Sequence, residues 1–238
     1  MIINLADFHA KYGAGRPPLV GAFKDVNVNP DIEIPVLTAL VDYIKAKRCL
    51  EIGCNTGATS AAILSGNETI QEYIGVDLPV IWFTKETAGS CALADSRFRL
   101  MQLENGSKDL HVGDIEPVDF IYVDGNHEYA WVGYDSQLAL SLLNPAGGII
   151  AWHDYNHPGN PGVKQYVHEL NDKNFIADNK EPRIIWVQGT TICFQYFENK
   201  QITAAPIAAQ EEINETTKPR KRSRKATEAI PSLESSPA

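Results

Sequence analysis

The sequence has no long hydrophobic run and no leader-like start. None of its apolar stretches approaches the roughly 18 residues that a membrane-spanning helix requires. The first residues, Met1–Asp7, have neither the basic patch nor the apolar segment of a secretory signal peptide. We therefore expect a cytoplasmic protein without a membrane span.

Paired cysteines are also lacking. The 238 residues include four cysteines, none of them in a CxxC pair: Cys49, Cys54, Cys91 and Cys193. In a chain of this length, such spacing is typical of reduced thiols. It argues against a disulfide framework and against a structural zinc site.

Positive charge is scarce over most of the chain. Residues 218–225 hold six of the 21 Lys and Arg, so residues 1–200 have 15 of them against 25 of the 30 Asp and Glu. Nucleic-acid binding needs clustered basic side chains that neutralise phosphates, and an acidic body excludes a broad face of that kind. Only the basic run at 218–225 could contact nucleic acid. The simpler interpretation of this run is a passive, solvated segment.

The composition divides the chain into three parts. From about residue 201 aromatic residues are absent, and small, polar and charged residues dominate. Such a segment buries too little apolar surface to offset its ordering entropy. We expect residues 201–238 to be a disordered basic tail, residues 48–200 to be the main domain, and residues 1–47 to be an N-terminal helical segment that caps it.

Strand-like and helix-like patterns alternate through the body. Short apolar runs suited to buried strands are found at 48–52, 73–77, 98–101, 118–124 and 149–152. Helical spacing of apolar residues is found at 35–44, 59–64, 134–143 and 163–170. Two β-rich runs, 183–187 and 191–197, then predict a hairpin. The pattern predicts an α/β fold: a Rossmann-like, doubly wound, mostly parallel sheet of seven strands with a C-terminal antiparallel hairpin.

A carboxylate and a glycine-bearing turn follow one another at the first of these strands. Glu51 ends the strand, and Gly53, Asn55 and Gly57 lie in the turn that opens the next helix. Glycines there let backbone N–H groups approach a ligand closely. A dinucleotide site would have a glycine where Asn55 stands. An acidic residue just before the turn suits a positively charged ligand, such as a sulfonium with its amino group.

The second strand ends at Asp77, twenty residues after Gly57. A carboxylate in that position can accept hydrogen bonds from both hydroxyls of a ribose. Together with the preceding turn, it indicates a ligand that contains adenosine.

Two polar segments, Asp124–Tyr129 and His153–His157, follow the fourth and fifth strands. In open α/β sheets, ligands bind outside the carboxyl ends of the strands, so we expect both segments at the same edge as Asp77. Their carboxylates and imidazoles suit general-base catalysis. They equally suit a divalent cation held by oxygen and nitrogen ligands.

Taken in order, these motifs resemble those of class I S-adenosylmethionine-dependent methyltransferases. More narrowly, they resemble the small O-methyltransferase-like family with a DGxHxY segment after strand four and an HD pair after strand five. The matching segments are Glu51–Gly53 with Gly57 and Ser60, Val76–Asp77, Asp124–Tyr129 with Val132 and Asp135, Leu142–Gly148, His153–Tyr155 and Pro161–Val163.

The resemblance makes residues 48–200 a methyltransferase domain and implies S-adenosylmethionine as its cofactor. The residues that it implies for cofactor binding are Glu51, Gly53, Asn55 and Gly57 at the methionine end, Asp77 at the ribose, Glu104 or Asn105 at the adenine, and Asp124. Which side chain contacts the base stays open, because the Gly-Asp pair usual after strand three is absent.

The resemblance also implies candidates for the chemistry. Asp124 and Asp154 stand where metal-dependent relatives bind Mg²⁺ or another divalent cation, and His153 or His127 could add a further ligand. The catalytic candidates are His127, His153 and Asp154, with either histidine as the base. The implied acceptor is an oxygen of a small molecule or glycan.

Two alternatives remain, a nicotinamide-dependent oxidoreductase and a non-catalytic protein that retains the Rossmann-like fold for binding. Asn55 counts against the first. Loops usually carry specificity on such scaffolds, so aromatic residues near them are candidates to line the acceptor pocket: Phe8, Tyr12, Phe23, Trp131 and Tyr155.

Overall fold

The computed structural model describes residues 1–17, 30–79, 88–178 and 183–198. The tail predicted for residues 201–238, with its basic run, lies outside these ranges, as does Phe23. Among the described residues, no helix combines the length and apolar character needed to cross a membrane.

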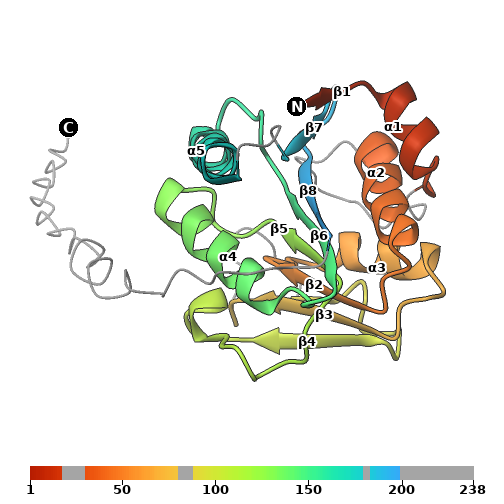
Figure 1. Ribbon diagram of the computed structural model, residues 1–238. Helices are drawn as coiled ribbons and strands as arrows, with labels where there is room; N and C mark the ends of the chain where they lie inside the picture. The colour runs from red at the N-terminus through yellow and green to blue at the C-terminus, as the bar shows by residue number, and fades with distance from the viewer. Residues whose placement is uncertain (18–29, 80–87, 179–182, 199–238) are drawn as a thin grey trace, which may run out of the picture. The chain divides into compact units, whose positions relative to one another are not determined.

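A mixed sheet of eight strands lies at the centre of the described chain (Figure 1). In spatial order the strands are β1 (Ile2–Ile3), β7 (Ile185–Val187), β8 (Cys193–Glu198), β6 (Gly147–Trp152), β5 (Phe120–Val123), β2 (Arg48–Ile52), β3 (Glu72–Asp77) and β4 (Phe98–Gln102). The neighbours from β6 to β4 are parallel, and β8 is antiparallel to both β6 and β7.

The predicted Rossmann-like α/β fold with its C-terminal antiparallel hairpin is therefore confirmed. The difference is β1, which pairs in parallel with β7 and adds an eighth strand to the seven expected. A strand of two residues has too few positions to show an alternating pattern, so β1 cannot be predicted from its sequence.

The order of the strands reverses between β2 and β5. From β2 the chain moves outward to β3 and β4, and it then returns to β5 on the other side of β2. Such a reversal is where ligands bind in open α/β sheets, outside the carboxyl ends of the strands. We call this end of the parallel strands the carboxyl edge.

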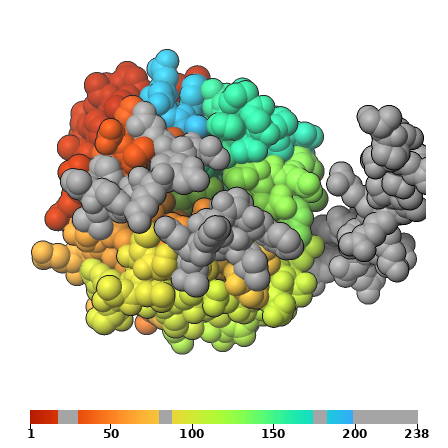
Figure 2. All heavy atoms as spheres, turned by 180° about the vertical axis from the view of Figure 1, so that it is seen from behind, coloured from red at the N-terminus to blue at the C-terminus, as the bar shows by residue number. Residues whose placement is uncertain are grey.

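Helices cover both faces of the sheet (Figure 1), and the space-filling view from behind shows the N-terminal segment in red on one side of the molecule and α5 in teal on the other (Figure 2). One face packs against α1 (Leu5–Tyr12), α2 (Pro30–Tyr43) and α3 (Ala58–Gly66), and the other against α4 (Tyr129–Leu142) and α5 (Pro161–Asp178). A short 3₁₀ helix, η1 (Gly106–Asp109), follows β4. Side chains alternate between the two cores: Cys49 packs with the first set of helices and Leu50 with the second.

The N-terminal aromatic residues belong to the core. Phe8 and Tyr12 are buried, and their ring centroids lie 6.0 and 5.2 Å from that of Phe194 on β8. The suggestion that they line an acceptor pocket is wrong for the described structure, because the amphipathic α1 turns both rings onto the sheet.

All four cysteines are free, as predicted. Three of them are buried, whereas Cys91 is exposed.

Candidate active site

The turn between β2 and α3 is shaped by backbone conformations that favour glycine. Gly53, Asn55 and Gly57 all have positive φ values, of 85°, 49° and 78°. A β-carbon at Gly53 would overlap the carbonyl oxygen of Asp124, and one at Gly57 would lie 2.9 Å from Gly89 Cα. The glycines therefore let this turn pack directly against neighbouring backbone.

A second segment closes on the same turn. The backbone N–H of Cys91 donates to Thr56 O at 2.8 Å, and that of Gly89 donates to Asn55 O at the same distance. The exposed thiol of Cys91 therefore sits beside the turn.

Asp77 joins the end of β3 to this turn. Its Oδ2 accepts the N–H of Asn55 at 2.5 Å, and its Oδ1 accepts the N–H of Leu78 at 2.7 Å. Burial raises the pKa of Asp77, although these two hydrogen bonds oppose the shift. The side-chain oxygen of Asn55 is buried next to it and has no hydrogen-bond partner among the described residues. Two acceptors are thus available where the sequence predicts the cofactor.

Glu51 lies beneath the turn. Its Oε2 accepts hydrogen bonds from Tyr73 OH at 2.9 Å and from Ser60 Oγ on α3. Burial raises its pKa to about 8, since the charged carboxylate is poorly solvated there. Direct contact between Glu51 and the methionine end of a cofactor stays a prediction.

The loop after β4 approaches the loop after β3. A β-carbon at Gly106 would lie 3.5 Å from Leu78 Cδ2. Of the two adenine candidates, Glu104 is exposed, and the amide of Asn105 is bonded to Asp109 at 3.0 Å. Either role toward the base stays a prediction.

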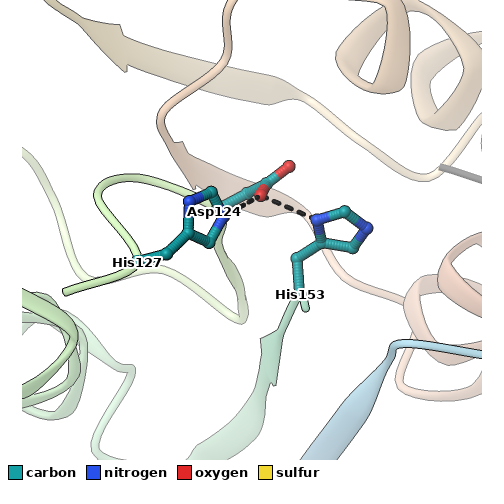
Figure 3. Close-up of side chains that lie close together, drawn as sticks. All are labelled: Asp124, His127 and His153. Carbon is teal, nitrogen blue, oxygen red and sulfur yellow. Dashed lines mark hydrogen bonds and ion pairs between the residues drawn. The ribbon is translucent and has the colours of Figure 1, made fainter. Parts of the chain in front are cut away.

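The acidic and imidazole groups after β5 and β6 converge, as the sequence predicts (Figure 3). Asp124 Oδ1 lies 2.9 Å from His153 Nδ1 and 3.5 Å from His127 Nε2. His127 Nε2 also lies 3.1 Å from Asp154 Oδ2. Four side chains from two strand ends thus form one ionic cluster at the carboxyl edge.

Asp154 adopts a left-handed backbone conformation, with φ of 56°. This conformation costs a non-glycine residue about 1 kcal/mol or more. It is held by the side chain of Asn160, which donates to Asp154 Oδ2, and by the N–H of His157, which donates to its carbonyl. Its Oδ1 is buried with no hydrogen-bond partner among the described residues. The same Oδ1 lies 3.5 Å from His153 Nδ1, and a strained acid beside an imidazole is typical of a functional site.

A fifth member of the cluster, Glu33, was not predicted. It comes from α2 and is only 1% exposed. The N–H and Oγ1 of Thr191 both donate to Glu33 Oε1 at 2.7 Å, and Oε2 lies 3.6 Å from His153 Nε2. The one signal in the sequence is an acidic residue within the apolar part of a helix.

The charges in the cluster support one another. Burial would lower the pKa of His153, but the carboxylates of Asp124 and Glu33 outweigh it and raise that pKa well above its usual value. Burial would likewise raise the pKa of Asp124, but His153 and His127 hold it below its usual value. A hydrogen bond to Asp124 raises the pKa of His127. The cluster therefore favours an imidazolium at the buried His153 and makes His127 a stronger base than a free imidazole.

The donor set fits a divalent cation. Asp124, His127 and His153 each offer one ligand atom, and these atoms lie within 4.8 Å of one another. This grouping includes both histidines that the sequence suggests as further ligands, but not Asp154. Two imidazoles and a carboxylate suit a transition-metal ion better than Mg²⁺, which prefers oxygen ligands.

The two aromatic candidates for the acceptor pocket have other partners. Tyr155 OH lies 2.7 Å from His168 Nε2, and its ring centroid lies 6.1 Å from that of Trp186. The ring of Trp131 lies under Lys108 Nζ at 3.8 Å. These contacts fix both rings beside the carboxyl-edge loops.

Comparison with known protein families gives a match over the segment that holds most of this site. A family described as a methyltransferase domain matches residues 50–155. A comparison with curated proteins gives no match.

Solved structures of low sequence identity share the fold. The O-methyltransferase TomG from Streptomyces achromogenes, in complex with S-adenosylmethionine, is 17% identical with a TM-score of 0.51, over 82% of this chain and 87% of that one. The O-methyltransferase from Bacillus cereus, in complex with S-adenosylhomocysteine, is 17% identical with a TM-score of 0.50, over 81% and 88%. A methyltransferase from Podospora anserina, bound to S-adenosylhomocysteine, is 20% identical with a TM-score of 0.50, over 75% and 80%.

Proposed function

We propose that this protein transfers the methyl group of S-adenosylmethionine to a hydroxyl oxygen of a small molecule or sugar, because residues 50–155 match a family described as a methyltransferase domain. Structural neighbours crystallised with S-adenosylmethionine or its product support the choice of cofactor.

The observation that carries the proposal is the junction of Asp77 with the β2–α3 turn. Two backbone N–H groups fix the Asp77 carboxylate, and each oxygen keeps a lone pair for one ribose hydroxyl. The buried amide oxygen of Asn55 is an acceptor beside it, suited to the ammonium of the methionine part. The Asn55 side chain also stands where a dinucleotide pyrophosphate would need glycine, which disfavours the nicotinamide alternative.

Methyl transfer is an in-line displacement that needs an aligned, deprotonated acceptor oxygen. His127 is the imidazole within reach of an acceptor, because 34% of its side chain is exposed against 4% for His153. We assign proton removal to His127, with Asp124 and Asp154 stabilising the imidazolium that forms. His153, buried between Asp124 and Glu33, holds Asp124 in position.

Asp124, His127 and His153 are also the side chains that would hold a divalent cation. Such an ion, when bound, supplies Lewis-acid stabilisation of the acceptor alkoxide or phenoxide. His127 would then serve as a ligand in place of a base, beside Asp154, which lies 3.1 Å from its Nε2.

The charge around the cluster narrows the class of acceptor. Glu33, Asp124 and Asp154 surround the histidines, and like charge disfavours an anionic acceptor at close range. A neutral polyhydroxylated molecule or a catechol-like ring suits this environment.

Calorimetry with S-adenosylhomocysteine tests the cofactor half of the proposal. The wild-type chain should bind it, and Asp77→Ala should weaken binding by about tenfold or more, because two hydrogen bonds to the ribose are lost. Asp114→Ala, which removes an exposed acid from a loop remote from the turn, is the matched control and should bind as the wild type does. Heat with NAD and none with S-adenosylhomocysteine would replace the proposal with the nicotinamide alternative.

A further inference from the structure

Helix α4 carries two adjacent buried polar residues that bond to different parts of the carboxyl edge. Ser107 Oγ of η1 donates to Asp135 Oδ1 at 2.5 Å. Trp152 Nε1, at the end of β6, donates to Ser136 Oγ at 2.9 Å. One side chain thus holds the segment after β4, and its neighbour holds the strand that leads to His153.

Further contacts fasten η1 to α4. Lys108 Nζ lies 3.8 Å from the centre of the Trp131 ring, and Tyr134 OH donates to Lys108 O at 3.4 Å. Trp131, Tyr134 and Asp135 lie on one side of α4 at positions i, i+3 and i+4. They contact two consecutive residues of η1. Side chains of α4, and not hydrogen bonds between the two backbones, therefore hold η1 against the helix.

Asp135 also lies against the loop after β5. A β-carbon at Gly125 would come within 2.9 Å of Asp135 Oδ2, so the absence of a side chain at Gly125 leaves space for the carboxyl group. On the other side of η1, Gly106 meets Leu78, the residue after Asp77. Asp135 therefore contacts both η1 and the loop after β5, and η1 in turn lies next to the residue that follows Asp77.

Burying this carboxyl group is unfavourable. Asp135 is 1% exposed, and burial raises its pKa to about 6 in spite of the hydrogen bond from Ser107. Burying an apolar residue at a helix–sheet interface costs less free energy than burying a carboxyl group. Packing alone therefore does not account for the polar pair, in which Asp135 accepts a hydrogen bond from Ser107.

We propose that Asp135 is a positioning residue for the cofactor base: through Ser107 it fixes residues 103–109 as the wall against which the adenine of S-adenosylmethionine lies. This inference rests on the proposed function. It assigns the Ser107–Asp135 pair to cofactor affinity and leaves the transfer step to the His127 cluster.

The test uses the full-length chain with two probes, S-adenosylhomocysteine and 5′-methylthioadenosine, the second of which keeps the adenosine but lacks the amino-acid end. Ser107→Ala should weaken both by about tenfold, because the wall loses its bond and Asp135 loses its donor. The kcat at saturating cofactor should stay within about twofold. Asp135→Asn retains an acceptor for the Ser107 hydroxyl, so its affinity for both probes should stay within about twofold of wild type.

Ser136→Ala is the matched control, since it removes a buried hydroxyl from the same helix turn but not from the η1 contact. It should lower the unfolding temperature and leave both affinities within about twofold. Unchanged affinity in Ser107→Ala, or an equal loss in Ser136→Ala, would overturn the proposal. A wild-type chain that does not bind S-adenosylhomocysteine overturns the proposed function itself and this inference with it.

Hydrogen exchange on the wild-type chain covers the case in which Ser107→Ala does not fold. Adding S-adenosylhomocysteine should slow exchange in residues 103–109 and in the first half of α4 together. Protection confined to the β2–α3 turn would contradict the coupling through Ser107 and Asp135.

Discussion

The β2–α3 turn and the cluster after β5 and β6 share one edge of the sheet, yet they are held in place differently. At the turn, backbone conformation sets the geometry: Gly53 and Gly57 have positive φ values, and Asp77 accepts two backbone N–H groups. In the cluster, side chains hold one another, with Asp124 between two imidazoles (Figure 3).

This difference predicts two kinds of sensitivity. The fold of a site shaped by backbone tolerates changes of charge but not added atoms, because its neighbours cannot move aside. A cluster of mutually bonded charges tolerates small changes of shape but depends on each member, since removing one leaves its partner buried and unpaired. Substitutions at each region can break or sharpen the contrast.

The largest effect is expected where the two regions touch. Gly53→Ala would bring a β-carbon into the carbonyl oxygen of Asp124, and we expect a loss of about 3 kcal/mol or more in the free energy of unfolding. Gly113→Ala is the control, because Gly113 also has a positive φ, of 104°, but has no other atom within 4 Å of the added carbon. Urea denaturation measures both; equal losses would show that the overlap at Gly53 is relieved at little cost.

The cluster should lose chemistry and keep the cofactor. His127→Gln should lower kcat by about 100-fold, because the acceptor loses its base or the cation loses a ligand. The dissociation constant of S-adenosylhomocysteine should stay within about twofold, which calorimetry measures. His111→Gln, which changes an exposed histidine in the loop before β5, is the matched control. A lower affinity of His127→Gln for S-adenosylhomocysteine would contradict the assignment of cofactor binding to the turn and of chemistry to the cluster.

Excess chelator separates the two roles of His127. Activity that disappears with chelator and returns with a divalent cation assigns Asp124, His127 and His153 as ligands. Full activity in chelator instead leaves proton transfer to His127.

The smallest effect concerns stability and pH at the turn. The pKa of Glu51 is raised from 4.5 to about 8 in the folded chain. Between these two pH values the folded state binds a proton that the unfolded state has lost, so stability falls as pH rises through this window. Glu51→Gln keeps an acceptor and removes this dependence, and at pH 8.5 it should raise the free energy of unfolding by about 1–3 kcal/mol.

Denaturation curves at pH 5 and pH 8.5 measure this change. The exposed Glu116 provides the control variant, Glu116→Gln, which should have no such effect. A Glu51→Gln chain that loses stability equally at both pH values would show that the carboxyl group matters for its shape alone.

Much of this arrangement could be predicted from the sequence because it depends on local patterns. The strands ending at Ile52 and Asp77 are apolar runs stopped by Gly53 and by a polar residue, and parallel strands bring their ends to one edge. For the same reason the convergence of Asp124 with His153 was predictable from strand order alone.

The remaining features depend on tertiary packing. Glu33 and His153 are 120 positions apart in the sequence. They come together only because α2 packs against the sheet. The group of possible ligands contains His127 and not Asp154, and Asp154 has a left-handed backbone conformation that no local pattern signals. The sequence shows that Phe8 is an aromatic residue in a segment expected near the acceptor, but it does not show which face of α1 meets the sheet.

The pairing of Cys91 with the β2–α3 turn has a practical consequence. Because Cys49, Cys54 and Cys193 are buried, a thiol-reactive dye should label the folded protein at one position, which is linked through its backbone to Thr56. The emission of such a dye would report on occupation of the neighbouring turn, so that screening of analogues would require neither radioactivity nor a known acceptor.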